Sequence, residues 1–136
     1  MADSRAREVI VLPGDALSHW ATVVKACTDP CLVVDAAGVV AAVSAPAAEL
    51  LGATCMVGQS LDATLRLVDY IDNALEAQGA ARRIPPLIAL SDNALSRGVM
   101  RILRPDGGRL LIDAVAAPIH DDEHRPIGSV SFLAAV

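Results

Sequence analysis

The chain has 136 residues and a formal net charge of −5; 54% of its residues are hydrophobic and 20% are charged. This length fits one domain, the apolar content excludes a disordered tail, and 3 cysteines are too few for a disulfide scaffold. The acidic balance argues against a nucleic-acid partner, since such proteins usually carry a basic face. With one Trp, one Tyr and one Phe, the core has to consist mainly of Ala, Val, Leu and Ile.

The apolar runs are short. Residues 31–34 end at Asp35 and residues 39–43 end at Ser44, whereas a membrane-spanning helix needs roughly 20 apolar residues. Residues 1–8 lack the basic-then-apolar order of a signal peptide. We therefore expect a cytoplasmic protein with no membrane partner, whose cysteines are reduced thiols.

Residues 1–28 are predicted to form an N-terminal extension that contains an amphipathic helix. Asp15, which follows Pro13 and Gly14, can cap this helix. The helix should end at Asp29, because the residue before a proline disfavours helical backbone. Its apolar residues recur at helical spacing and form the stripe Leu17, Trp20, Ala21, Val24 and Cys27.

Two short apolar strands follow at residues 31–35 and 39–43, and the turn at Gly38 predicts a hairpin. The next helix is capped by Ser44 or Ala45 and closed by Gly52. Further apolar residues at helical spacing predict helices at residues 62–77 and 87–95, the second of them ending near Gly98.

The last third of the chain is predicted to be strand, at residues 99–104, 109–119 and 127–135. Asp106 and Gly107 after a proline are typical of a tight turn between the first two of these strands. Strands on either side of a helical block predict a single α+β domain, in which short helices lie on one face of a five-stranded antiparallel sheet.

This order of elements and turns resembles that of a PAS domain over residues 29–136. Four segments carry the resemblance: DPCLVVDAAGVV at 29–40, AAELLG at 47–52, VGQSL at 57–61, and RPDGG at 104–108 with API at 117–119 and IGSV at 127–130. The resemblance implies a non-catalytic sensory domain that forms a homodimer. Two features depart from the family, namely Ser44-Ala45 where an Asn is common and the absence of a closing Asp-x-Thr. The chain is therefore either a stand-alone module or a piece of a longer regulator.

Bound cofactors are not expected. Flavin-binding members of the family carry a reactive cysteine in a Gly-x-Asn-Cys-Arg-Phe-Leu-Gln segment, and the surroundings of Cys55 do not match it. Residues 61–98 contain no histidine that could ligate a haem. His120 and His124 lie in a turn rich in charged residues, which we interpret as a solvated loop rather than a metal site.

The sequence offers two candidate sites, each with a plainer alternative. The helix stripe is either core or, as the resemblance implies, a dimer interface formed by Leu17, Trp20, Val24 and Cys27. A pocket for a small apolar molecule, unless the same residues simply fill the core, would be lined by Leu65, Val68, Tyr70, Leu87, Leu90, Met100, Ile112 and Val130.

Three functions remain open at this stage. The first is a dimeric, cytoplasmic signalling module in which a ligand or a partner biases the packing of the first helix and the chain end against the sheet. That partner is a C-terminal effector domain or a separate regulator. The second is a constitutive, ligand-free dimerisation or scaffold domain of a larger regulator. The third, a small enzyme, finds no converging catalytic groups in the sequence.

Overall fold

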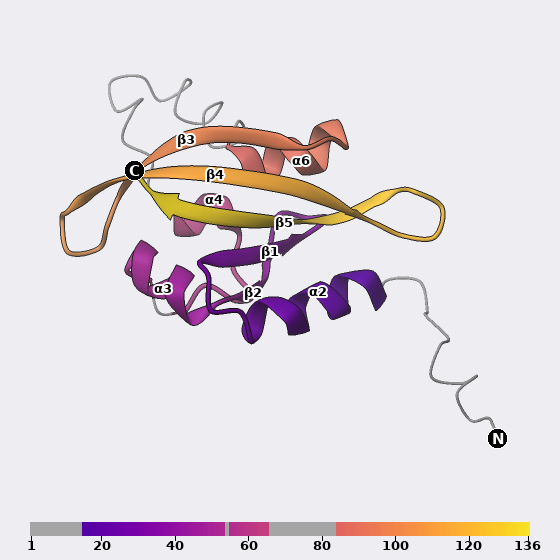
Figure 1. The fold of residues 1–136 in the computed structure, drawn as a ribbon, viewed down its shortest axis with the longest axis horizontal. Coiled ribbons are helices and arrows are strands. Elements are labelled where there is room, and N and C mark those ends of the chain that lie inside the picture. Colours follow the sequence, from indigo (N-terminus) through magenta and orange to yellow (C-terminus); the bar gives the residue numbers. More distant parts are fainter. Residues whose placement is uncertain (1–14, 54, 66–83) are drawn as a thin grey trace.

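A computed structural model of the chain describes residues 15–53, 55–65 and 84–136 (Figure 1). Within these residues, five strands form one antiparallel sheet in the order β2-β1-β5-β4-β3. The strands are β1 Cys31–Asp35, β2 Val40–Val43, β3 Ser96–Leu103, β4 Arg109–His120 and β5 Pro126–Ala135. The helices are α2 Asp15–Lys25, α3 Ala45–Leu51, α4 Leu61–Thr64 and α6 Pro85–Asp92. The predicted fold class is confirmed.

Helices cover both faces of this sheet. The short helices α3, α4 and α6 lie on one face, which we call the helix side, and α2 lies along the other, the outer side (Figure 1). Neighbouring residues of β1 show the division, because Val34 packs in the helix-side cluster and Val33 in the outer cluster. Side chains of a strand point alternately to the two faces, so a strand covered on both faces is apolar throughout.

Strand β5 lies between β1 and β4 and pairs with both. A glycine at position 128 of β5 allows β5, β1 and α2 to approach one another closely. A Cβ atom there would stand 2.4 Å from the Val34 carbonyl oxygen and 2.7 Å from Cδ1 of Leu17 on α2. Gly128 therefore lets the sheet and the first helix come together at one point.

Two element boundaries differ from the prediction. Gly98 was expected to end a helix, but α6 ends at Asp92, and Asn93, with a φ of 51°, provides the left-handed C-cap. Gly98 instead pairs with Ala114 inside β3. The helix expected at residues 62–77 begins as α4, which Leu65 ends with extended backbone. The remainder of that predicted helix lies outside the described residues.

The Ser44 hydroxyl joins three segments of the fold. It is fully buried, accepts hydrogen bonds from the backbone N–H of Ala47 (3.2 Å) and Cys31 (3.0 Å), and donates one to the Asp29 carbonyl (2.8 Å). Ser44 rather than Ala45 thus caps α3. The same hydroxyl holds the backbone where the chain enters β1.

None of the helices in the described part of the chain has the length and hydropathy that a membrane crossing requires. The helix expected in the N-terminal extension is present as α2, which ends at Lys25, four positions before Asp29. Because the outer cluster includes side chains from α2, β1 and β5, this helix packs on the sheet.

Replacing Ser44 with Ala should lower the free energy of unfolding by about 2 kcal/mol, because three backbone groups lose their partner and two of those hydrogen bonds are buried. Urea unfolding followed by circular dichroism measures this. The control is Ser91→Ala, which removes an exposed hydroxyl and should change the free energy by less than about 0.5 kcal/mol. Equal effects of the two substitutions would contradict the role given to Ser44.

Candidate functional site

The predicted pocket residues do not form one lining. Met100, Ile112 and Leu65 lie in the helix-side cluster, and Leu87 packs against it from α6. Val130 lies in the cluster on the opposite face of the sheet. Its assignment to the same pocket was wrong, because Val130 shares its face of β5 with Phe132. The remaining members are Leu90, which lines a surface groove, and Val68 and Tyr70, which lie outside the described residues.

Two serines occupy the helix side of β5 in place of the expected valine. Ser129 and Ser131 are both fully buried. The Ser129 hydroxyl donates a hydrogen bond of 2.7 Å to the carbonyl oxygen of Pro86 at the start of α6. The Ser131 hydroxyl has no partner within the described residues. An unpaired buried hydroxyl costs roughly 1–3 kcal/mol. The Nε atom of Arg104 is likewise buried without a partner among the described residues, and Ser131 is the hydroxyl that a bound molecule could satisfy.

Apolar residues flank Ser131 in the sheet. It pairs with Ala116 of β4 and Leu32 of β1, and both are buried. Sequence reasoning missed this position because Ser129 and Ser131 alternate with Val130 and Phe132, a pattern that suggests a solvent-facing polar side. The pattern misleads here because β5 is an interior strand whose helix side is covered.

The hollows at the surface of the described residues include two that contain members of the predicted pocket. The first, of about 590 Å³, runs between the hairpin turn at Gly38 and α6, and includes Leu87 and Leu90 of the predicted pocket. The second, of about 330 Å³, lies between the end of α3 and β3 and includes Leu65. Members of the predicted lining are thus divided between separate hollows and the core.

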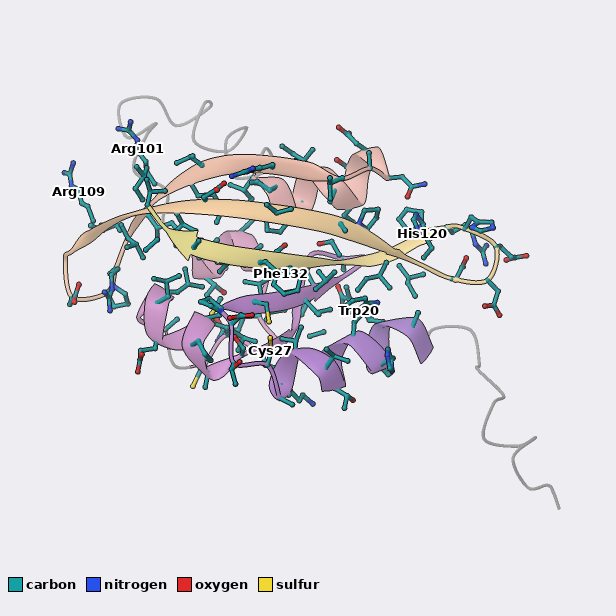
Figure 2. All side chains as sticks on the ribbon, viewed as in Figure 1. Trp20, Cys27, Arg101, Arg109, His120 and Phe132 are labelled. Carbon is teal, nitrogen blue, oxygen red and sulfur yellow. The ribbon has the colours of Figure 1, made fainter. Side chains whose placement is uncertain are left out.

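The stripe of α2 packs against its own sheet. Val24 is 1% exposed, and Leu17, Trp20 and Cys27 are half-buried against the outer cluster. Figure 2 shows Trp20 and Cys27 between the helix and the strands. The stripe is therefore part of the outer cluster, and Val24 within it is inaccessible to a second chain. Leu17, Trp20 and Cys27 keep partly exposed surface, and a dimer interface through them stays a prediction.

Beyond α2, the outer side of the sheet carries an exposed patch on β3, β4 and β5. It contains Val99, which is 57% exposed, and Phe132, which is 43% exposed. Arg97 and Asp113 form an ion pair of 2.6 Å beside them. The strand register places all these side chains on one face, because Val99 pairs with Asp113 and both Arg97 and Phe132 pair with Val115. We call these five residues the outer patch.

The ion pair sets the charge state of the outer patch. The hydrogen bond from Arg97 holds the pKa of the Asp113 carboxyl below its ordinary value, and the same bond raises the pKa of the guanidinium. Both groups therefore stay charged at neutral pH. The sequence analysis did not predict this surface. The alternation of Arg97 and Val99 with buried Met100 is the pattern that could have indicated an exposed face of β3.

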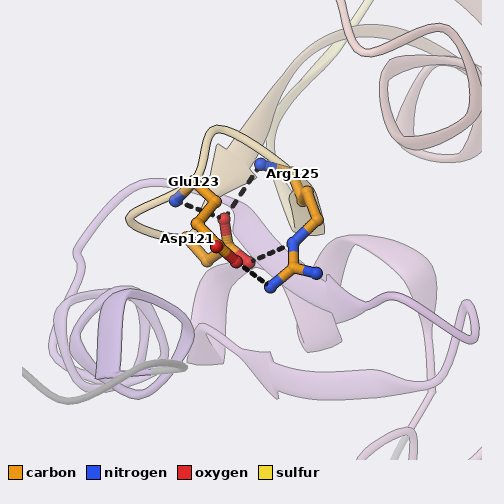
Figure 3. Close-up of polar contacts among 3 residues, drawn as sticks. All are labelled: Asp121, Glu123 and Arg125. Carbon is orange, nitrogen blue, oxygen red and sulfur yellow. Dashed lines mark hydrogen bonds and ion pairs between the residues drawn. The ribbon is translucent and has the colours of Figure 1, made fainter.

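The turn between β4 and β5 is organised by its own acidic residue (Figure 3). The Asp121 carboxylate accepts hydrogen bonds from the backbone N–H groups of Glu123 (2.8 Å) and Arg125 (2.9 Å), and pairs with the Arg125 guanidinium at 3.0 Å. The backbone hydrogen bond from Arg125 is the main cause of the lowered pKa of Asp121. Among the described residues no cluster of three or more His, Cys, Asp or Glu side chains is placed to hold a metal ion.

Known proteins match this chain through structure rather than sequence. No protein-family model and no curated protein matches the sequence. Solved structures of similar fold include a PAS domain from Colwellia psychrerythraea, with 18% identity and a TM-score of 0.63 over 88% of this chain and 96% of that one. The PAS domain of the fruit-fly ELK potassium channel has 13% identity and a TM-score of 0.67 over the same shares, 88% and 96%.

A light-oxygen-voltage domain, whose mechanism was probed with a flavin analogue, has 14% identity and a TM-score of 0.62 over 87% of this chain and 84% of that one. At such low identity these matches establish the fold. The chain has a PAS-type fold, as the sequence resemblance indicated.

Replacing each β5 serine with Ala should have opposite consequences in the ligand-free protein. Ser129→Ala removes a paired hydroxyl and should lower the free energy of unfolding by about 1 kcal/mol. Ser131→Ala removes an unpaired one and should be neutral or stabilising. The two positions share a strand and a face, so each is the control for the other in urea unfolding. A larger loss for Ser131→Ala would show that this hydroxyl has a partner.

Proposed function

We propose that this chain is a non-catalytic, cytoplasmic sensory module that acts as a homodimer and takes a small, largely apolar molecule as its input. The PAS-type fold supports the sensory role, and the unpaired Ser131 hydroxyl is the observation that carries ligand binding. The recipient of the signal is a C-terminal effector domain or a separate regulator. The alternative is a constitutive, ligand-free scaffold domain of a larger regulator.

The surroundings of Ser131 define the proposed ligand. Its helix-side neighbours in the sheet are hydrocarbon, as is the core cluster that includes Met100 and Ile112. A molecule that fits such a layer has an apolar body and one group able to hydrogen-bond a hydroxyl. A short acyl chain with a carbonyl or hydroxyl end has this chemistry.

A coloured cofactor is not part of the proposal. The match to a light-oxygen-voltage domain makes flavin the obvious competitor. However, Cys55 lacks the sequence context of a photoreactive cysteine, and its side chain is exposed. Of the three histidines, His19 and His124 are exposed, whereas His120 contacts the side chain of Asn93, the C-cap of α6.

Native mass spectrometry of the purified full chain should show a retained small molecule that disappears under denaturing conditions. The sample should have no absorption between about 350 and 500 nm, where a bound flavin or haem would absorb. Ser131→Ala should retain at least about tenfold less of the molecule, because the polar group of the molecule loses its hydrogen-bond partner, whereas Ser18→Ala, at an exposed position of α2, should match the wild type. A chain without added mass would favour the scaffold alternative, and visible absorption would indicate a cofactor.

The outer patch is the proposed dimer surface. Its centre is apolar, through Val99 and Phe132, and its charges comprise one cation and one anion, Arg97 and Asp113. In a two-fold contact the same patch faces itself, so each Arg97 can approach the partner's Asp113. A patch that combines an apolar centre with balanced charges is therefore complementary to a second copy of itself.

Light scattering coupled to size exclusion should give the mass of a dimer for the wild type and of a monomer for Val99→Glu. Burying an unpaired carboxylate in the contact should weaken association at least about tenfold. The matched control is Val57→Glu, since Val57 is 56% exposed, as against 57% for Val99, and lies outside the patch. Thermal unfolding verifies that both variants fold. A monomeric wild type, or a dimeric Val99→Glu, would overturn this surface.

A further inference from the structure

The two edges of the sheet differ in whether the described chain covers them. At the β2 edge, the N–H of Val40 donates a hydrogen bond to the Gln59 carbonyl (2.9 Å), and the Val40 carbonyl accepts one from the N–H of Gly58 (2.8 Å). Strand β3 is the outermost strand at the opposite edge (Figure 1), and among the described residues it pairs only with β4. An additional strand can therefore join the sheet beside β3, whereas the β2 edge is occupied.

The backbone of β3 presents every second peptide group to this open edge. The N–H of Arg104, the residue after β3, donates a hydrogen bond to the Gly108 carbonyl (2.7 Å). Because paired residues of an antiparallel ladder exchange hydrogen bonds only at every second position, the even-numbered residues of β3 are bonded to β4. The N–H and C=O groups of Arg97 and Val99 consequently point to the edge, where a new strand would bind them.

Strand β3 has few of the features that protect an edge strand from pairing. Such strands are commonly short, or carry a bulge, a proline or charged side chains. Strand β3 has 8 residues, its register with β4 is continuous, and its sequence contains no proline. Val99, in the middle of the strand, is 57% exposed. Of the protective features, β3 has only its charges, which are both positive.

These charges determine which strand fits. Residues 96–113 of the β3–β4 hairpin contain four arginines and two aspartates, in a chain whose net charge is −5. Like charges on adjacent strands repel, which disfavours pairing with β3 of a second copy and favours an acidic strand. The ion pair with Asp113 uses Nε and Nη2 of Arg97, but the Arg97 side chain is still 69% exposed. A second carboxylate can therefore approach it.

We propose that β3 binds an acidic, extended segment of a partner protein as an additional strand of the sheet, antiparallel to β3. The segment exchanges backbone hydrogen bonds with Arg97 and Val99. An acidic side chain lies beside Arg97, and an apolar one beside Val99. The antiparallel direction continues that of all the existing pairs. This binding uses the edge of the sheet and the proposed dimer uses its outer face, so different measurements test the two.

Amide hydrogen exchange of the full chain, followed by NMR, tests the proposal at single residues. In the free protein, the amides of Arg97 and Val99 should exchange at least about tenfold faster than those of Gly98 and Met100, which are bonded to β4. The probe is the peptide acetyl-Thr-Glu-Thr-Val-Thr-Glu-Thr-amide. At saturation it should slow exchange at Arg97 and Val99 at least about tenfold and leave Gly98 and Met100 unchanged.

Three results would overturn the proposal. Slow exchange at Arg97 and Val99 in the free protein would show that another segment of this chain covers the edge. Exchange that slows as the protein concentration rises would show that a second copy covers it. Unchanged exchange in the presence of saturating peptide would show that the peptide does not bind at β3.

Modified peptides provide matched controls that leave the protein unchanged, with affinity measured by calorimetry. In the proposed pairing the N–H of the peptide valine faces β3, and the N–H groups of its threonine neighbours face away. Methylation of the valine nitrogen should weaken binding at least about tenfold, and methylation of a neighbouring threonine nitrogen less than about threefold. Equal losses would exclude strand pairing. Replacing both glutamates with lysine should also weaken binding at least about tenfold, and equal affinity would contradict the acidic preference.

Discussion

The fold depends on the position of β5 between β1 and β4. This strand joins the N-terminal hairpin to the C-terminal strands, and it contributes side chains to both faces. Ser129, Ser131 and Leu133 face the helix side, while Val130 packs beneath α2. At the end of the β1–β5 pairing residue 128 is glycine, and a side chain there would collide with β1 and with α2 together. The close approach of β5 to β1 and the packing of α2 on the sheet therefore meet at this one residue.

The two sides of the sheet have different chemical roles. The helix side is a hydrocarbon layer with paired and unpaired hydroxyls on one strand, which suits the recognition of a small molecule. The outer side is divided between the cluster under α2 and the outer patch. Because β5 contributes to both, a change in its helix-side packing would reach Val130 and Phe132 through the strand itself. This connection gives the proposed ligand site a physical path to the proposed dimer surface.

The segment around Ser44 links the remaining features. Its hydroxyl caps α3 and holds the backbone at Asp29 and Cys31, where the chain enters β1. The connection between α2 and the sheet is thus held at its strand end by hydrogen bonds, and α2 itself is held by packing on the outer cluster.

The local sequence determined the elements. Apolar runs ended by turn residues predicted the strands, the spacing of Leu17, Trp20 and Val24 predicted α2, and the order of segments indicated the PAS-type fold. What the sequence could not determine was which face each residue occupies relative to the rest of the chain. Val130 was assigned to the wrong side, and Ser131 was overlooked, because alternation reveals two faces but not what covers them. The contact of α2 with its own sheet was decided only by tertiary packing, because it depends on where separate elements meet.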